Sequence, residues 1–415
     1  MKNSEKMLVS LDQQDLAHAN KYFKRALEQD DSETLFDLAA YLESIGFFPQ
    51  AKEIYLQIRD EFPEVNLNLA QIANEDGAIE EAFEYLEAIG PDSLYYLEAL
   101  VVKADLYQSD GLADVAREKL LEAASLSDEP IILFGLAELE MELGEFKEAV
   151  VHYALLDNRD IYEMTGVSTY QRIGIAYASL GKFEAAIEYL EKAVELEYED
   201  QTVFELATIL YDQEEYQKAN LYYKQLDTIN PDFEGYEYAY AQSLHAEHKI
   251  EEALDMVEKG LAKNDFDTVL LLLASQYAYE LHDSKAAEDY LLKAQEVAED
   301  QNEVTLRLTN LYLEQERYDQ VVALNNEELD NVVARWNIAK AYQVLEEDEA
   351  ALEIYDQLRE DLADNPEFLA DYIAALRLEG DIQLAKELAH RYLHLVPDDL
   401  IMQEFYNEVN HDGDQ

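Results

Sequence analysis

The sequence contains no cysteine, which excludes both disulfides and metal sites built from thiolates. Only 13 glycines and 7 prolines occur in 415 residues, a balance that favours helices joined by short turns. Basic residues are scarce as well: 30 lysines and arginines stand against 92 aspartates and glutamates, for a formal net charge of −62. A field of that sign repels phosphate backbones and anionic lipid surfaces, so we expect neither a nucleic-acid partner nor membrane binding.

Long apolar runs are also missing. The run VLLLLA at 269–274 is far too short to span a bilayer, and the first fifteen residues have no apolar stretch long enough for a signal peptide. We therefore expect a soluble, cytoplasmic protein without direct membrane insertion. Nearly half of the residues (49%) are apolar, which excludes a wholly disordered acidic chain, and the length indicates several domains or a repeat array.

A small residue recurs along the whole chain at intervals of about 34 residues. Eleven of these twelve positions, which we call the anchor positions, are alanine. They are Ala19, Ala51, Ala82, Ala116, Ala149, Ala186, Ala219, Ala253, Ala287, Val321, Ala351 and Ala385. Such regularity indicates a repeat architecture.

Each repeat unit has the pattern of two amphipathic helices, as in GIAYASLGKFEAAIEYLEKA at 174–193. Apolar and small residues follow helical spacing on both sides of Gly181. Gly181 ends the first helix, where a left-handed backbone suits a residue without Cβ. The anchor alanine, here Ala186, is small because the two helices approach closely at that point. The unit is therefore a helix–turn–helix.

This pattern resembles the tetratricopeptide repeat (TPR), a 34-residue helical hairpin. The matching positions in this copy are Gly174, Tyr177, Gly181, Phe183, Ala186, Leu190 and Ala193. The resemblance covers nearly the whole chain and implies an all-α fold, a right-handed superhelical solenoid of about twelve repeats. A weaker resemblance, in stretches such as KADLYQSDGL at 103–112, is to YpiA-type TPR proteins of Gram-positive bacteria.

The sequence departs from the TPR pattern in two ways. The glycine between the helices is replaced in five consecutive copies, by Glu214, His248, His282, Glu316 and Glu346, and returns at Gly380. The connection at 157–168 is long, and the spacing after 323–333 is short. We expect the superhelix to bend at these two places. We accordingly divide the chain into an N-terminal array (1–157), a middle array (158–330), and C-terminal repeats with a capping helix (331–415).

The resemblance implies that the first helix of each pair lines a concave groove, which solenoids use to bind partners. Aromatic and amide side chains at groove positions supply contact area and hydrogen bonds to a bound segment. The predicted groove residues of these kinds are Phe36, Asn68, Gln71, Phe134, Gln171, Phe204, Tyr211, Tyr238, Gln242, Gln276, Tyr279, Asn310, Trp336 and Asn337. The alternative is that many of these aromatics form the core between repeats and that the amides are solvated.

One mixed cluster of basic, amide and aromatic residues stands out. It comprises Arg307, Asn310, Trp336, Asn337 and Lys340, and it is a candidate anion pocket. The alternative is that these cations offset neighbouring carboxylates. Basic residues are too few on the first helices for a carboxylate clamp of the usual TPR form.

No catalytic set is recognisable, and we expect no enzyme activity, cofactor or metal. The pair His390 and His394 lacks the glutamate of a zincin motif, and no glycine-rich phosphate loop or calcium-hand spacing occurs. With acids this abundant, neighbouring glutamates arise by chance and do not mark acid–base catalysis.

The leading interpretation is a non-enzymatic scaffold that binds a protein or peptide segment, predicted to be basic, in its groove. Matching carboxylates on the first helices are Glu33, Asp37, Glu64, Glu98, Asp105, Glu138 and Glu205. A second interpretation is a peptide-sensing regulator, although the repeat is already in phase at Ala19 and leaves no room before it for an effector domain. A third is that the acidity reflects adaptation to salt and says nothing about partners. The oligomeric state and the identity of the partner stay open.

Overall fold

In the computed structural model, which describes residues 1–412, every regular element is an α-helix and no strand occurs within that range. The prediction of an all-α chain is thus confirmed. The chain divides into two compact units, Met1–Ile209 and Leu210–Gln415, and each is described by itself. Residues 413–415 of the predicted C-terminal part lie outside the described residues.

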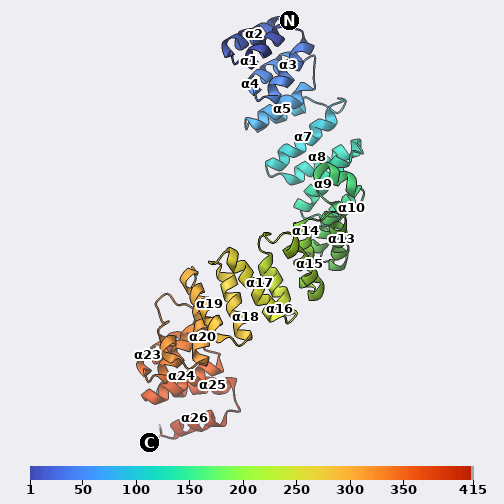
Figure 1. Ribbon diagram of the computed structural model, residues 1–415. Coiled ribbons are helices and arrows are strands. Elements are labelled where there is room, and N and C mark those ends of the chain that lie inside the picture. Colours follow the sequence, from blue (N-terminus) through green and yellow to red (C-terminus); the bar gives the residue numbers. More distant parts are fainter. Residues whose placement is uncertain (413–415) are drawn as a thin grey trace. The chain divides into compact units, whose positions relative to one another are not determined.

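Unit 1 (Met1–Ile209) is a succession of antiparallel helix pairs, visible in Figure 1 from the N-terminus onward. Its pairs are α1 (Asn3–Asp12) with α2 (Leu16–Gln29), α3 (Ser32–Ser44) with α4 (Phe48–Ile58), α5 (Val65–Glu75) with α6 (Ile79–Glu87), α7 (Tyr96–Ser109) with α8 (Ala113–Leu126), α9 (Pro130–Glu142) with α10 (Phe146–Tyr153), and α12 (Thr169–Ser179) with α13 (Phe183–Leu196). One helix outside this scheme, α11 (Asn158–Thr165), occupies the long connection noted in the sequence.

The boundary between the units falls inside α14 (Asp200–Asp212). Unit 2 continues with α15 (Tyr216–Ile229) and then with five pairs and one closing helix, α26 (Leu400–Asp412). These pairs are α16 (Tyr236–Ala246) with α17 (Ile250–Lys263), α18 (Thr268–Glu280) with α19 (Ser284–Val297), α20 (Asn302–Glu314) with α21 (Tyr318–Val322), α22 (Val332–Val344) with α23 (Asp348–Leu358), and α24 (Pro366–Glu379) with α25 (Ile382–Leu395). The short α21 accounts for the reduced repeat spacing.

The anchor positions behave as the sequence predicts. All twelve lie on the second helix of a repeat and none is more than 2% exposed. Gly174 shows how tightly the paired helices pack, because a Cβ at this residue of α12 would lie 2.6 Å from Cγ of Leu190 in α13. Burial of such small residues lets larger apolar side chains fill the space around them, and the core of each unit is continuous over several pairs.

The turn inside each pair requires a left-handed residue. Gly46, Gly77, Gly111, Gly144, Gly181 and Gly380 all have positive φ at this point. The copies without glycine keep the same backbone: φ is 61° at Glu214, 63° at His248, 64° at His282, 56° at Glu316 and 59° at Glu346. The first pair does likewise at Gln14, which the sequence comparison did not single out. The left-handed turn is therefore retained in the copies that have lost the glycine best suited to it.

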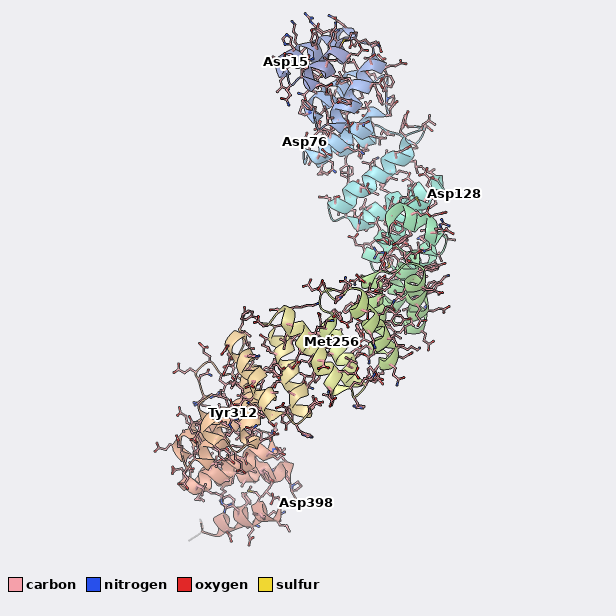
Figure 2. All side chains as sticks on the ribbon, viewed as in Figure 1. Asp15, Asp76, Asp128, Met256, Tyr312 and Asp398 are labelled. Carbon is pink, nitrogen blue, oxygen red and sulfur yellow. The ribbon has the colours of Figure 1, made fainter. Side chains whose placement is uncertain are left out.

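The two places where we expect the superhelix to bend coincide with two irregularities in the series of helix pairs, the added α11 and the short α21. Whether the superhelix bends there, its right-handedness and the total of about twelve repeats stay predictions, as does the division into three arrays. The acidic charge is spread along unit 1, since Asp15, Asp76 and Asp128, labelled in Figure 2, lie at three different connections between helices.

Candidate functional site

In unit 2, side chains connect the first helices of successive pairs. Four hydrogen bonds join residues 35 apart, one repeat plus one residue. His245 of α16 contacts Glu280 of α18 (Nε2 to Oε2, 2.7 Å), and Tyr279 of α18 donates to Glu314 of α20 (2.7 Å). The other two run from Arg307 of α20 to the carbonyl of Leu272 in α18 and from Trp336 of α22 to Asp371 of α24, each at 3.0 Å. A hydrogen bond from Asn337 of α22 to Asn310 of α20 supplies the link that these four leave out, so the first helices α16 to α24 form one connected surface.

This surface is hollowed across α18, α20 and α22, and we call the hollow the amide pocket. Its volume is about 560 Å³. Six predicted groove residues line it: Gln276, Tyr279, Arg307, Asn310, Asn337 and Lys340. Leu291, Leu311 and Leu313 supply apolar wall, and Ser275 and Glu314 complete the polar lining. The pocket therefore offers both apolar contact and several hydrogen-bonding groups, which is the usual make-up of a binding site.

The charge in the amide pocket is opposite to that of the chain as a whole. Its lining holds two cations, Arg307 and Lys340, and one carboxylate, Glu314, which accepts the hydrogen bond from Tyr279. Arg307 is held in place by Glu303 (Nε to Oε1, 2.6 Å) as well as by the Leu272 carbonyl. These contacts fix the direction of the guanidinium before any ligand arrives.

Lys340 and Asn337 are positioned by their neighbours on α20 and α22. The Nζ atom of Lys340 lies 4.3 Å from the centroid of the Trp336 ring, a cation–π contact. Asn337 is buried and donates to Oδ1 of Asn310 at 2.7 Å. Asn310 is exposed and lines the pocket, and its amide nitrogen is not used in the bond to Asn337.

Trp336 itself is only 7% exposed and packs edge-on against Phe368, with ring centroids 5.8 Å apart. Its indole therefore forms part of the core between repeats, and the face of its ring contacts the ammonium group of Lys340. Asp371, which accepts the indole hydrogen bond, has a pKa raised by burial, although Trp336 and Lys340 oppose that effect.

A second group of predicted residues lies at the start of unit 2. Tyr238 and Tyr279 are exposed, and Gln242 donates to the Tyr238 hydroxyl at 2.9 Å. Tyr211 packs against Tyr216, with centroids 5.6 Å apart, and burial raises its pKa. Tyr238 and Tyr279 thus give α16 and α18 an exposed aromatic surface, which Tyr279 joins to the amide pocket.

In unit 1 the predicted groove residues are spread over α3, α5, α9, α12 and α14. Phe36 packs against Phe62 and Tyr55, and Phe134 is buried against Tyr153. Asn68 donates to Glu43 at 2.9 Å. The remaining three are Gln71, which is exposed, Gln171, which is buried and bonds to Glu205, and Phe204, which is half-buried.

Two polar residues of the amide pocket were missed by sequence reasoning, Ser275 and Glu314. Ser275 is buried and gave no signal by type or spacing. Glu314 could have been found, because it lies 35 residues after Tyr279, the same separation that joins His245 to Glu280.

No helix in the described part of the chain combines the length and apolar character needed to cross a bilayer. Residues 1–412 also hold no group of three or more histidines and carboxylates arranged to hold a metal ion. His390 and His394 lie together, with ring centroids 4.4 Å apart, and His394 bonds to the His390 carbonyl.

Family models for tetratricopeptide repeats match four stretches of the chain. General TPR models match residues 36–93 and 167–200. Residues 108–161 match the YpiA-like tetratricopeptide repeats, and residues 333–399 match the YpiA-like C-terminal tetratricopeptide repeats. The amide pocket lies mostly outside these stretches, and only Asn337 and Lys340 fall inside one.

Among curated proteins the chain is similar to the TPR repeat-containing protein YpiA of Bacillus subtilis (strain 168), with 28% identity over 321 residues that make up 76% of each chain. Among solved structures it is similar to Naa15/Naa10 bound to HypK-THB, with 15% identity and a TM-score of 0.43 over 89% of this chain and 64% of that one. It is also similar to YrrB, described as a TPR protein with an unusual peptide-binding site, with 18% identity and a TM-score of 0.38 over 48% of this chain and 97% of that one.

Proposed function

Since the chain is a tetratricopeptide-repeat protein, we propose that it is a non-enzymatic scaffold of the cytoplasm that binds an extended, basic segment of a partner protein on its first-helix surface. Tetratricopeptide repeats indicate a protein-interaction role, and the basic segment and its place of binding are the parts that we add.

The amide pocket is the observation that carries the proposal. An extended segment presents backbone carbonyls and N–H groups at regular intervals, and these need partners when they are taken out of water. Gln276, Asn310 and Asn337 offer amides, while Arg307 and Lys340 offer charged donors to the carbonyls. The leucines around them give the side chains of the segment an apolar contact.

The basic character of the partner follows from the charge on both units. The net charge of −62 is distributed over the helices, and Glu33, Asp37 and Glu98 are exposed at the groove positions of unit 1. Lysines and arginines of a partner would be drawn to such a surface, mainly through faster association. That attraction weakens as salt shortens the Debye length to about 3 Å at 1 M.

The test is to capture partners on the immobilised full chain and to repeat the capture with Arg307→Ala/Lys340→Ala. The matched control is Lys285→Ala/Lys293→Ala, which removes two exposed cations of α19 and so changes the net charge equally. A partner that uses the amide pocket is expected to bind the Arg307→Ala/Lys340→Ala variant at least tenfold more weakly. It is expected to bind the control variant with unchanged affinity. Equal binding to all three forms contradicts the proposal.

In the second part of the same experiment, binding is measured at increasing salt concentration. Binding of a captured partner is expected to fall as KCl is raised from 0.05 to 0.5 M. The same salt titration tests the alternative interpretation, in which the acidic composition is an adaptation to high salt and says nothing about partners. If molar KCl strongly raises the melting temperature of the chain while binding is indifferent to salt, the charge serves stability and not the partner.

A further inference from the structure

A second hollow opens on unit 2, at the ends of the helices that carry the aromatic surface. It lies between the connection from α15 to α16, the end of α17 and the start of α18, and its volume is about 470 Å³. We call it the acidic pocket. Tyr238 is the one predicted groove residue in its lining.

Two glycines shape the acidic pocket. Gly260 lies where α17 crosses its neighbours, and a Cβ there would be 2.8 Å from Cδ1 of Leu270 and 3.3 Å from Cβ of Glu237. Gly235 precedes α16 with φ of 82° and lets the connection from α15 turn away from the helix ends. The residues at the close contact of α17 with Glu237 and Leu270 line the bottom of the acidic pocket. The connection from α15 to α16 lines its outer edge.

The lining holds four carboxylates against one ammonium group. That ammonium, Lys263, is already engaged, because it forms an ion pair with the buried Glu237 and donates to the Pro231 carbonyl. Asp232, Glu234 and Asp267 form no ion pair within residues 1–412. Asp267 uses one oxygen to cap α18, at 3.0 Å from the Leu270 N–H, and keeps the other.

Apolar surface adjoins these carboxylates. Val269 of α18 is 57% exposed and Tyr238 of α16 is 39% exposed, and both line the pocket. Phe266, in the connection just before α18, is 68% exposed although it is a large aromatic residue. An exposed apolar wall next to unpaired carboxylates fits a ligand that is itself part apolar and part cationic.

We propose that the acidic pocket receives an arginine or lysine side chain of the bound segment, together with an aromatic or branched apolar residue next to it. This inference rests on the proposed function and names the residue type that anchors the segment. The methylene stem packs on Val269 and Tyr238, and the charged head reaches Asp232, Glu234 and the second oxygen of Asp267. The neighbouring apolar residue covers Phe266.

The probe is a library of random twelve-residue peptides displayed on phage and selected on the full chain. We expect the selection to enrich peptides that carry Arg or Lys next to an aromatic or branched apolar residue. The same peptides are then measured by fluorescence anisotropy against Asp232→Asn/Glu234→Gln/Asp267→Asn. Asparagine caps helices as well as aspartate does, so the third substitution removes charge and leaves the start of α18 intact.

The matched control is Glu251→Gln/Glu252→Gln/Asp255→Asn, which neutralises three exposed acids on the outer side of α17. We expect the pocket variant to weaken the enriched peptides at least tenfold and the control to change affinity less than twofold. Val269→Lys, which places a cation on the exposed rim, is expected to act like the pocket variant. Circular dichroism checks that each form is folded.

The outcomes separate the two proposals. Peptides that respond to Arg307→Ala/Lys340→Ala but bind the pocket variant as well as the control overturn this inference and leave the proposed function standing. Enriched peptides without the basic–apolar pattern also overturn it. A selection that enriches no peptide sensitive to either pocket overturns both.

Discussion

Trp336 and Asp371 are joined by a hydrogen bond of 3.0 Å, from the indole Nε1 of one first helix to Oδ2 on the next. The bond holds a half-buried carboxylate, and this burial raises the pKa of Asp371 above its ordinary value. The pair also supports Lys340, whose ammonium lies on the indole ring. Lys340 in the wall of the amide pocket therefore lies next to a carboxylate whose pKa is raised by burial.

The first prediction concerns the pH dependence of that carboxylate. Because the folded state raises the pKa of Asp371, its contribution to stability is complete below the unfolded pKa of about 3.9 and is lost as pH rises through the folded pKa. Asp371→Asn, which keeps an oxygen acceptor, is expected to raise the melting temperature at pH 8. The gain is expected to shrink as pH falls to 5, above the isoelectric point of about 4.1.

Glu353→Gln on the exposed side of α23, which is not among the groups that shift the pKa of Asp371, controls for the general loss of negative charge. Melting curves by circular dichroism at three pH values make the comparison. A gain of the same size for both variants at every pH would show that burial of Asp371 has no special effect.

The second prediction concerns the left-handed turns. A residue other than glycine in this conformation costs about 1 kcal/mol or more. Glu316→Gly is therefore expected to raise the free energy of unfolding by about 0.5–1 kcal/mol, part of the gain being offset by the flexibility of glycine in the unfolded chain. Gly380→Ala, at the equivalent turn, is expected to lower it by about 1 kcal/mol. Urea unfolding followed at 222 nm measures both, and shifts of the same sign would contradict the explanation.

The third prediction concerns a buried carboxylate in unit 1. Glu140 of α9 is fully buried between His152, at 2.7 Å from its Oε2, and Arg117, at 3.5 Å from its Oε1. Glu140→Ala removes the buried carboxylate that both side chains contact, while Arg117 keeps its ion pair with Glu145, so the substitution is expected to cost about 1.5–3 kcal/mol. Glu145, which also contacts Arg117 but whose side chain is 39% exposed, is the control, and Glu145→Ala is expected to cost less than about 1 kcal/mol. Similar losses in chemical unfolding would refute the special role of Glu140.

The fourth prediction concerns the close crossing of α12 and α13. A methyl group on Gly174 would meet Leu190, so Gly174→Ala is expected to lower the free energy of unfolding by about 1–3 kcal/mol. The same substitution in a Leu190→Ala background is expected to cost clearly less, because the clashing atoms are gone. A double-mutant cycle measured by urea unfolding gives the coupling, and strictly additive effects would mean that the helices move apart without strain.

The sequence was sufficient for the repeat itself. The anchor positions and the turn at Gly181 could be predicted because each depends on local sterics: a small side chain where helices cross, and a residue without Cβ where φ is positive. The extra helix α11 was seen only as a long connection, because DNRDIYEMTGVS has too few residues for a clear period.

The candidate site was predictable in part. Six of the predicted groove residues line the amide pocket, yet Trp336 and Phe134 are buried in the core. A first helix contacts neighbours on several sides, so an aromatic residue on it can face either the groove or the adjoining repeat, and periodicity does not separate the two. Of the acidic pocket only Tyr238 was predicted, because the pocket is formed by residues of two connections and the ends of three helices, which have no shared period.

Within each unit, the contacting helices lie one or two places apart along the chain. Low sequence separation of contacts is associated with fast folding, since little loop entropy is lost before native contacts form. A helix pair in the middle of a unit can thus nucleate structure as readily as one near its end, and growth proceeds by adding one pair at a time. Long as it is, the chain is able to begin folding as soon as its first pairs leave the ribosome.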